Sequence, residues 1–391
     1  MEHQSRTSNT ALTVGLVLAV CFAVTVLSAS FAHSQTYEVL YSFSGGSDGG
    51  NPSGLTLDTE GNLYGTTELG GSGTYGTVFK LINDGNYTVL HAFTGGADES
   101  SPHGVIRDSE GNLYGTTSGG FDYGSPYGTV FKLAVTGKFT NLYTFRGRKD
   151  GAYPTGGLLK DAEGNLYGVT DESGEFGVGT VFEVSQTGKE RIVYSFHNLP
   201  DGQYPLYETL VMDSNHNLYG TTFDGGALNQ GTVFKVNAWT GKEEILHSFG
   251  GNGDGALPYS GLLLDGKGNL YGTTSNGGIA GAGTIFKLSP RGKETLLYKF
   301  LGGSDGICPM GSLVLDATGD LYGTTVYGGA NSRGTAYKLT GSGQETLLHS
   351  FDWAEGMNPY SGLVQDAAGN FYGTTAVGGA IGSGTVFKLV P

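Results

Sequence analysis

Residues 369–389 read GNFYGTTAVGGAIGSGTVFKL, and closely related stretches recur along the whole chain. Each contains the tetrad Tyr-Gly-Thr-Thr, or once Tyr-Gly-Val-Thr, followed by Gly-Thr-Val-Phe-Lys-Leu or a close variant. The seven tetrads, spaced 50 to 53 residues apart, begin at Tyr64, Tyr114, Tyr167, Tyr219, Tyr271, Tyr322 and Tyr372. A repeat period near 50 residues is typical of propellers, solenoids or repeat arrays.

Each unit contains four short segments that have the composition of β-strands. They are rich in β-branched and aromatic residues and are bounded by Gly, Asp and Asn turns. In one unit the segments are residues 262–265, 269–274, 284–288 and 294–300. No segment shows a helical period, so we predict an all-β fold with four antiparallel strands per unit.

The two ends of the repeat region complete each other. The seventh unit stops after its third predicted strand, residues 385–389, and its missing outer strand appears near the start, at residues 37–43. A ring closed in this way leaves no open sheet edge, whereas an open solenoid gives no reason for the offset. We therefore predict that residues 36–391 form one seven-bladed β-propeller whose last blade is closed by the N-terminal strand.

The repeated motif Gly-Asn-Leu-Tyr-Gly-Thr-Thr, with the following Gly-Thr-Val-Phe-Lys-Leu, resembles that of the GloVer tandem-repeat proteins, and the resemblance covers residues 36–389. The shorter pattern Asp-x-x-Gly-Asn-Leu-Tyr is similar to NHL-type propeller repeats. Resemblance to the GloVer family implies an exported bacterial β-propeller.

The N-terminal segment has the pattern of an export signal. No charged residue occurs from Ala11 to Ala32, and the stretch ends in Ser30-Phe31-Ala32. We predict a signal peptide over residues 1–32, with an uncleaved anchor as the alternative. The expected location is secreted, periplasmic or cell-envelope. The mature chain is expected to have no membrane span and to be a monomer.

Composition narrows the range of partners. The 391 residues include 71 glycines, and the formal net charge is −15, which disfavours nucleic acid and anionic lipid. Cys308 is the one cysteine beyond the predicted signal peptide, so no disulfide is expected within the mature chain.

Seven acids occupy equivalent places, each four residues before a proline. One interpretation is a carboxylate ring around the channel mouth that attracts Ca²⁺ or a cationic ligand. The other is an Asp-Gly turn that every blade needs. Ca²⁺ takes six to eight oxygens from one locality, so we favour the turn and expect no metal. The acids are Asp48, Asp98, Asp150, Asp201, Asp254, Asp305 and Glu355.

Departures from the repeat are concentrated in units two to four. They supply aromatic rings, carboxylates and guanidinium groups that a glycan or small polar ligand would need, on one sector of one face. The alternative is loop drift with weak surface ion pairs. The candidate ligand-binding residues are Phe121, Tyr123, Tyr127, Arg146, Arg148, Asp171, Glu172, Tyr207 and Glu208.

Catalysis has less support in the sequence. No GxSxG, HExxH, P-loop or paired-cysteine motif occurs, and we expect no cofactor. His91, His247 and His349 take a place that tyrosine fills in other units, so we predict that they are wall residues. The weak catalytic candidates are His103, Tyr207 and Glu208.

We predict an exported binding or interaction propeller with an unidentified ligand, a glycan being one candidate. A polysaccharide lyase or hydrolase on the same scaffold is the first alternative. A structural envelope protein is the second.

Overall fold

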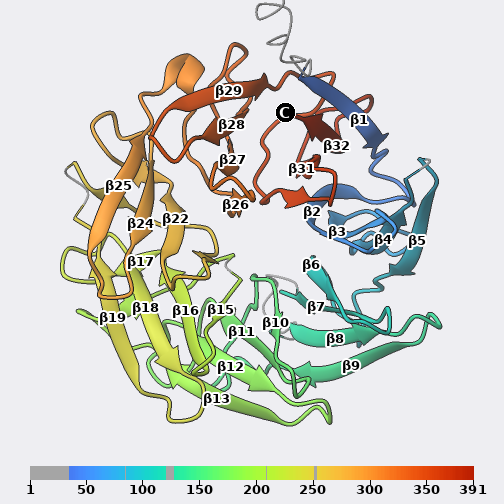
Figure 1. The fold of residues 1–391 in the computed structure, drawn as a ribbon. Coiled ribbons are helices and arrows are strands. Elements are labelled where there is room, and N and C mark those ends of the chain that lie inside the picture. The colour runs from blue at the N-terminus through green and yellow to red at the C-terminus, as the bar shows by residue number, and fades with distance from the viewer. Residues whose placement is uncertain (1–34, 84, 120–126, 208, 251–252) are drawn as a thin grey trace, which may run out of the picture.

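A computed structural model describes residues 35–83, 85–119, 127–207, 209–250 and 253–391. Seven four-stranded sheets stand around a central axis like the blades of a propeller (Figure 1). Neighbouring strands within every sheet are antiparallel. The predicted fold and blade number are confirmed. The predicted signal peptide, residues 1–32, lies outside the described residues.

The blades follow one another along the chain, each running from the axis outwards. Blade one comprises β2 (Gly50–Leu57), β3 (Leu63–Leu69), β4 (Thr77–Leu81) and β5 (Tyr87–Ala92), and blade two comprises β6 (Pro102–Arg107), β7 (Leu113–Thr117), β8 (Thr129–Leu133) and β9 (Phe139–Thr144). Blade three comprises β10 (Leu159–Lys160), β11 (Leu166–Thr170), β12 (Thr180–Val184) and β13 (Glu190–Ser195). Blade four comprises β15 (Val211–Met212), β16 (Asn217–Thr222), β18 (Thr232–Asn237) and β19 (Glu243–Ser248). Blade five comprises β21 (Leu263–Leu264), β22 (Leu270–Thr274), β24 (Thr284–Leu288) and β25 (Glu294–Lys299). Blade six comprises β26 (Val314–Leu315), β27 (Leu321–Thr325), β28 (Thr335–Leu339) and β29 (Glu345–Ser350). Blade seven comprises β30 (Val364–Gln365), β31 (Phe371–Thr375), β32 (Thr385–Val390) and β1 (Thr36–Ser42). The short pair β14 (Gly202–Gln203) with β17 (Asp224–Gly225) contacts blade four, and the pair β20 (Gly255–Ala256) with β23 (Asn276–Gly277) contacts blade five. The 3₁₀ turn η1 (Gly303–Asp305) follows β25.

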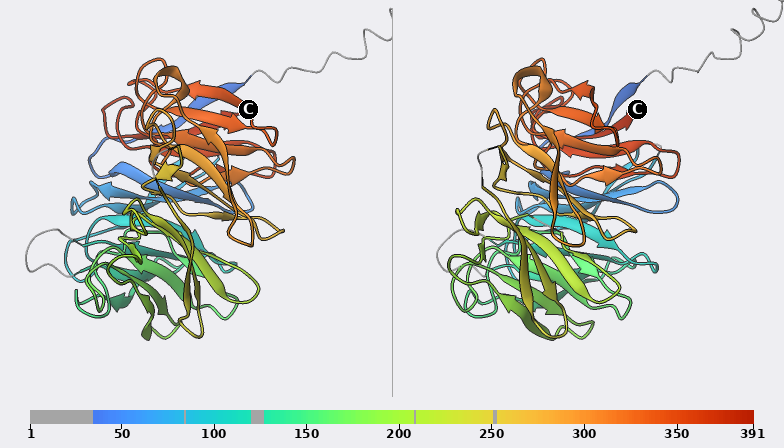
Figure 2. Two further views of the ribbon diagram at one scale, coloured as in Figure 1. Left: turned by 90° about the vertical axis from the view of Figure 1, so that its left-hand side faces the viewer. Right: turned by 60° about the vertical axis from the view of Figure 1, so that its left-hand side comes forward.

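Strand β1 closes the ring by pairing with β32, from Thr36 opposite Val390 to Ser42 opposite Thr385. Figure 2 shows β1 lying beside the last blade in both views. A bulge interrupts this pair near Val39, and the third and outer strands of blades one to six carry a bulge at the equivalent place. The closing pair therefore has the same geometry as the pairs formed within one continuous repeat.

The core lies between blades. A buried phenylalanine directly follows the outer strand of each blade, and its ring contacts an aromatic ring on the third strand of the next blade edge to face. The seven ring centroid distances lie between 5.0 and 5.5 Å. Such contacts contribute about 0.5–1.5 kcal/mol each beyond the burial of their area. The pairs are Phe43–Phe79, Phe93–Phe131, Phe145–Phe182, Phe196–Phe234, Phe249–Phe286, Phe300–Tyr337 and Phe351–Phe387.

The same backbone geometry joins each blade to the next near the axis. The residue before every repeated proline is left-handed, with φ between 54° and 58° in all seven blades. At the fourth-to-fifth junction the Leu257 N–H donates to the Gln230 carbonyl of the preceding blade, and the Leu257 carbonyl accepts from the Ser275 N–H. Gly283, which opens the Gly-Thr-Ile-Phe-Lys motif, has φ 102°, and a Cβ there would lie 2.5 Å from Pro309 Cδ of the next blade. The repeated glycine and proline therefore fit one close junction.

The Asp-x-x-Gly-Asn-x-Tyr motif builds the turn that joins the first two strands of each blade. In blade one, Asp58 accepts hydrogen bonds from the Asn62 backbone and side chain and from the Tyr64 hydroxyl. These bonds outweigh the effect of burial and lower the pKa of Asp58.

Within the described ranges no helix is long and apolar enough to cross a membrane.

Candidate functional site

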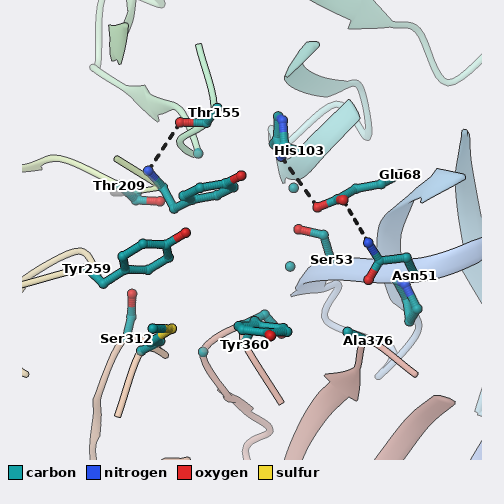
Figure 3. A pocket seen from close by; sticks show the side chains of 18 residues that line it. Asn51, Ser53, Glu68, His103, Thr155, Thr209, Tyr259, Ser312, Tyr360 and Ala376 are labelled. Carbon is teal, nitrogen blue, oxygen red and sulfur yellow. Dashed lines mark hydrogen bonds and ion pairs between the residues drawn. The ribbon is translucent and has the colours of Figure 1, made fainter. Parts of the chain in front are cut away.

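A cavity of about 390 Å³ occupies the centre of the ring (Figure 3). Its wall comes chiefly from the residues that directly follow the repeated prolines, where the chain enters the innermost strand of each blade. Because every blade presents one such residue to the axis, this ring of positions can vary without disturbing the core. The residues are Ser53, His103, Thr155, Tyr259, Met310 and Tyr360, and Tyr207 takes this place in blade four.

One side of the cavity carries a carboxylate, an amide and an imidazole. Asn51 Nδ2 donates to Glu68 Oε2 at 2.7 Å, and His103 Nδ1 lies 3.9 Å from Glu68 Oε1 (Figure 3). His103 is only 5% exposed, and neither ring nitrogen has a hydrogen-bond partner in the described part of the chain. A buried polar group without a partner costs free energy, so a ligand that bonds His103 would recover it.

Tyrosine rings form the opposite side. Tyr207 and Tyr259 stack with centroids 5.1 Å apart, and the ring of His103 meets Tyr207 edge to face at 5.7 Å. Tyr360 completes the aromatic lining from blade seven. Behind this layer, Thr155 Oγ1 donates to Asp171 Oδ1 at 2.6 Å and accepts from the Tyr207 backbone N–H at 3.2 Å. The backbone that carries the Tyr207 ring is thereby held by the neighbouring blade.

Burial governs the charges in and behind the cavity. Loss of water raises the pKa of Glu68 to about 7 and lowers that of His103 to about 4. Burial also raises the pKa of Asp171 to about 8, although the Thr155 bond opposes the shift. No lysine or arginine is among the described residues that line the cavity. The lining therefore carries little net charge near neutral pH, and its few ionisable groups are mainly carboxyls. It offers no cation to an anionic ligand.

The structure brings only part of the predicted ligand-binding set to this cavity. Tyr207 lines it, and Asp171 lies behind it through Thr155. The remaining described candidates lie elsewhere, whereas Phe121, Tyr123 and Glu208 are outside the described residues. Of the catalytic candidates, His103 and Tyr207 both line the cavity.

Local contacts explain why the other candidates do not converge. Arg146 pairs with Asp150 in the turn after the outer strand, and Arg148 bonds the same carboxylate through its backbone N–H. Tyr127 contacts Tyr153 edge to face, and the backbone of Glu172 pairs with that of Ala152. The two arginines are thus held within one turn, and Tyr127 and Glu172 contact the segment that enters blade three.

The seven repeated acids lie at the outer strands and not at the channel mouth. The Asp48 carboxylate accepts from the Ser44 backbone N–H of its own turn and from the Tyr41 hydroxyl of the outer strand. The same arrangement of turn acid and outer-strand side chain recurs around the ring. Turn geometry places these groups at the perimeter because the outer strand ends there.

Sequence reasoning missed Glu68, Asn51, Tyr259 and Tyr360. One signal was present: the residue after each Tyr-Gly-Thr-Thr tetrad is small or apolar in the other blades but acidic at Glu68 and at Asp171. The residue after the repeated proline also varies more than its neighbours. The residue after the proline lines the cavity in six blades, and the residue after the tetrad lines it at Glu68 and Ala376, which the repeat pattern alone did not reveal.

A family model described as the Gloeobacter/Verrucomicrobia repeat matches residues 25–125, 70–267 and 253–391. The chain belongs to this family. No curated protein matches the sequence of this Gloeobacter/Verrucomicrobia repeat protein.

Solved structures share its fold at low sequence identity. An oligogalacturonate lyase in complex with manganese has a TM-score of 0.58 at 12% identity, covering 87% of this chain and 89% of its own. The extracellular domains of two putative hybrid two-component systems from B. thetaiotaomicron, BT4673 and BT3049, have TM-scores of 0.58 and 0.56 at 12% and 13% identity. The matches cover 90% and 91% of this chain but only 39% and 41% of theirs, so this repeat protein spans about two fifths of their length.

Proposed function

We propose that this protein is an exported propeller that binds a neutral saccharide in its central cavity. The observation that carries the proposal is the stacked pair Tyr207 and Tyr259 facing the Glu68–Asn51 bond across one cavity. Sugar rings present C–H faces that pack on aromatic rings and hydroxyls that bond carboxylates and amides. Export is supported by the uncharged stretch Ala11–Ala32 and by the likeness to extracellular domains.

The charge of the cavity favours a neutral ligand over an anionic one. A uronate polymer needs cations to hold its carboxylates, and the described lining supplies none. Neutral His103 can donate one hydrogen bond and accept another, which suits a sugar hydroxyl. The cavity volume of about 390 Å³ lies within the usual range for small-molecule sites.

Calorimetric titration of the full chain with neutral and anionic oligosaccharides tests the proposal. We expect binding of a neutral glucose-, mannose- or xylose-based oligomer and none of an oligogalacturonate. Tyr259→Ala should weaken binding about tenfold, because an aromatic contact contributes about 0.5–1.5 kcal/mol beyond its area. Trp239→Ala, which removes an exposed ring that stacks on His216, is the matched control and should bind normally. Binding that survives Tyr259→Ala and Glu68→Gln would show that the cavity is not the site.

One observation favours a second candidate, a glycoside hydrolase. Glu68, with a pKa of about 7 raised by burial, is suited to act as a general acid at neutral pH. Nitrophenyl glycosides provide a direct assay, and Glu68→Gln should abolish turnover while leaving binding within a few-fold. Absence of turnover with sugars that bind would leave the binding function and reject the hydrolase.

A further inference from the structure

A second cluster of potential ligands lies far from the axis, where blades four and five meet. It consists of His247 on β19, Asp254 in the following turn and Glu294 on β25 of the next blade. His247 Nε2 lies 3.4 Å from Asp254 Oδ2 and 3.7 Å from Glu294 Oε1. One donor atom from each of the three residues lies within 4.8 Å of the other two.

Two of the three donor atoms are left without hydrogen bonds by the fold. Both His247 Nε2 and Glu294 Oε1 are buried atoms with no hydrogen-bond partner in the described residues. Asp254 is held in place by the backbone N–H groups of Gly250 and Gly255, at 2.9 and 2.7 Å. Glu190, Glu243 and Glu345 carry the same unpartnered oxygen at other junctions, so the feature peculiar to this junction is an unpartnered imidazole nitrogen between two carboxylates, which a further group would complete.

The other six blade junctions show that this combination occurs once. The outer-strand residue is His91, His247 or His349 in three blades and tyrosine in the other four. The residue that reaches back from the next blade is a glutamate at 190, 243, 294 and 345 and aromatic at the other three junctions. Behind His91 and His349 an aromatic ring, Phe139 or Tyr37, stacks on the imidazole and fills the space. Among the described junctions, an outer-strand histidine faces a glutamate on the outer strand of the next blade only at His247 and Glu294.

The distances suit a small divalent transition metal. Ligand bonds of about 2.0–2.1 Å in a tetrahedral site place donor atoms about 3.3 Å apart. The two measured separations from His247 Nε2, 3.4 and 3.7 Å, are close to this value. An imidazole with two carboxylates selects a zinc-like metal over Ca²⁺, which prefers six or more oxygens.

We propose that His247, Asp254 and Glu294 bind one Zn²⁺-like ion that links blades four and five. A water molecule fills the fourth position, because the three side chains remain about one fifth exposed. Two carboxylates and a neutral imidazole neutralise the ion. The Lys299 ammonium, which lies beside Glu294 and donates to the Gly253 carbonyl, adds the remaining nearby charge. The ion therefore links blades four and five in addition to the aromatic contact between them.

Titration of the EDTA-treated full chain with zinc sulfate tests this proposal. We expect one Zn²⁺ per chain and a rise in melting temperature. When Co²⁺ is added in place of Zn²⁺, we expect a visible absorption spectrum typical of a four-coordinate site without thiolate ligands. His247→Tyr and Glu294→Gln should each weaken binding at least tenfold. Tyrosine occupies the His247 place in four other blades, so His247→Tyr is expected to fold.

His91→Tyr is the matched control, since His91 has a turn acid, Asp98, but no glutamate partner. It should leave zinc binding unchanged. Zinc binding that persists in both His247→Tyr and Glu294→Gln, or that fails in the wild-type chain, would overturn the proposal. If binding instead disappears in His103→Phe, the ion belongs to the central cavity.

Discussion

Replacing Tyr337 with phenylalanine should stabilise the protein. Tyr337 is completely buried on β28, and its hydroxyl has no hydrogen-bond partner among the residues described. The six equivalent positions in the other blades hold phenylalanine. Burial raises the pKa of Tyr337 above its ordinary value, as expected for a phenol without water.

The magnitude follows from the hydroxyl alone, because the ring contacts are unchanged. Tyr337 and Phe300 have centroids 5.1 Å apart, within the range of the other six pairs. An unsatisfied buried hydroxyl costs about 1–3 kcal/mol. For a cooperative unit of roughly 350 residues, whose unfolding entropy is about 0.7 kcal/mol/K, Tyr337→Phe should raise the melting temperature by about 1.5–4 °C.

The assay is thermal unfolding followed by near- and far-ultraviolet circular dichroism. Phe286→Tyr is the matched control: it places a hydroxyl at the same point of blade five, against Gly272, and should destabilise by a similar amount. Comparing the two variants cancels the difference between the two side chains in the unfolded chain. A Tyr337→Phe variant that is equal to or less stable than the wild type would refute the reasoning, since it would mean that the hydroxyl is satisfied.

Three further outcomes are expected. Leu257→Asn should stabilise by about 1 kcal/mol in urea unfolding, because asparagine tolerates the left-handed backbone better and already occupies this place at two other junctions; an unchanged midpoint would argue against strain. Gly283→Ala should destabilise by about 2–4 kcal/mol, since its Cβ would meet Pro309, whereas Gly319→Ala, with nothing within 4 Å, should cost only about 1 kcal/mol; equal costs would exclude the proline contact. Burial raises the pKa of Glu345 to about 7, so its protonated form is favoured in the folded state. Its contribution to stability is present below the ordinary pKa of 4.5 and is lost as pH rises through about 7. The fall in melting temperature from pH 5 to pH 8 should therefore be smaller in Glu345→Gln, and a slope equal to the wild type would contradict this.

The repeat pattern was sufficient to predict the ring, because periodic residues report contacts that every blade makes. The offset between residues 37–43 and 385–389 predicted the closing strand. The strand and turn motifs that define each blade are local in sequence and recur seven times.

The candidate site was only partly predictable, because it is built from single residues of blades that are distant in sequence. His103 and Tyr207 were recognised as departures from the repeat, but Glu68 lies in a unit that otherwise follows the pattern. Arg146 and Arg148 were expected beside Tyr207, yet Asp150 pairs with the Arg146 side chain and accepts from the Arg148 backbone N–H in a turn at the perimeter. Deciding which departures face the axis requires the three-dimensional arrangement.

The antiparallel pairing of β1 with β32 also determines how the ring responds to a mechanical load. Thr36 lies opposite Val390, so the outer ends of both strands leave the seam at the same point. Tension applied to the two chain ends pulls perpendicular to the strands and separates the hydrogen bonds one after another, starting from that point. The ring should therefore open at low force when pulled by both ends. If instead it were pulled by one end and by an internal blade, several bonds would share the load in shear.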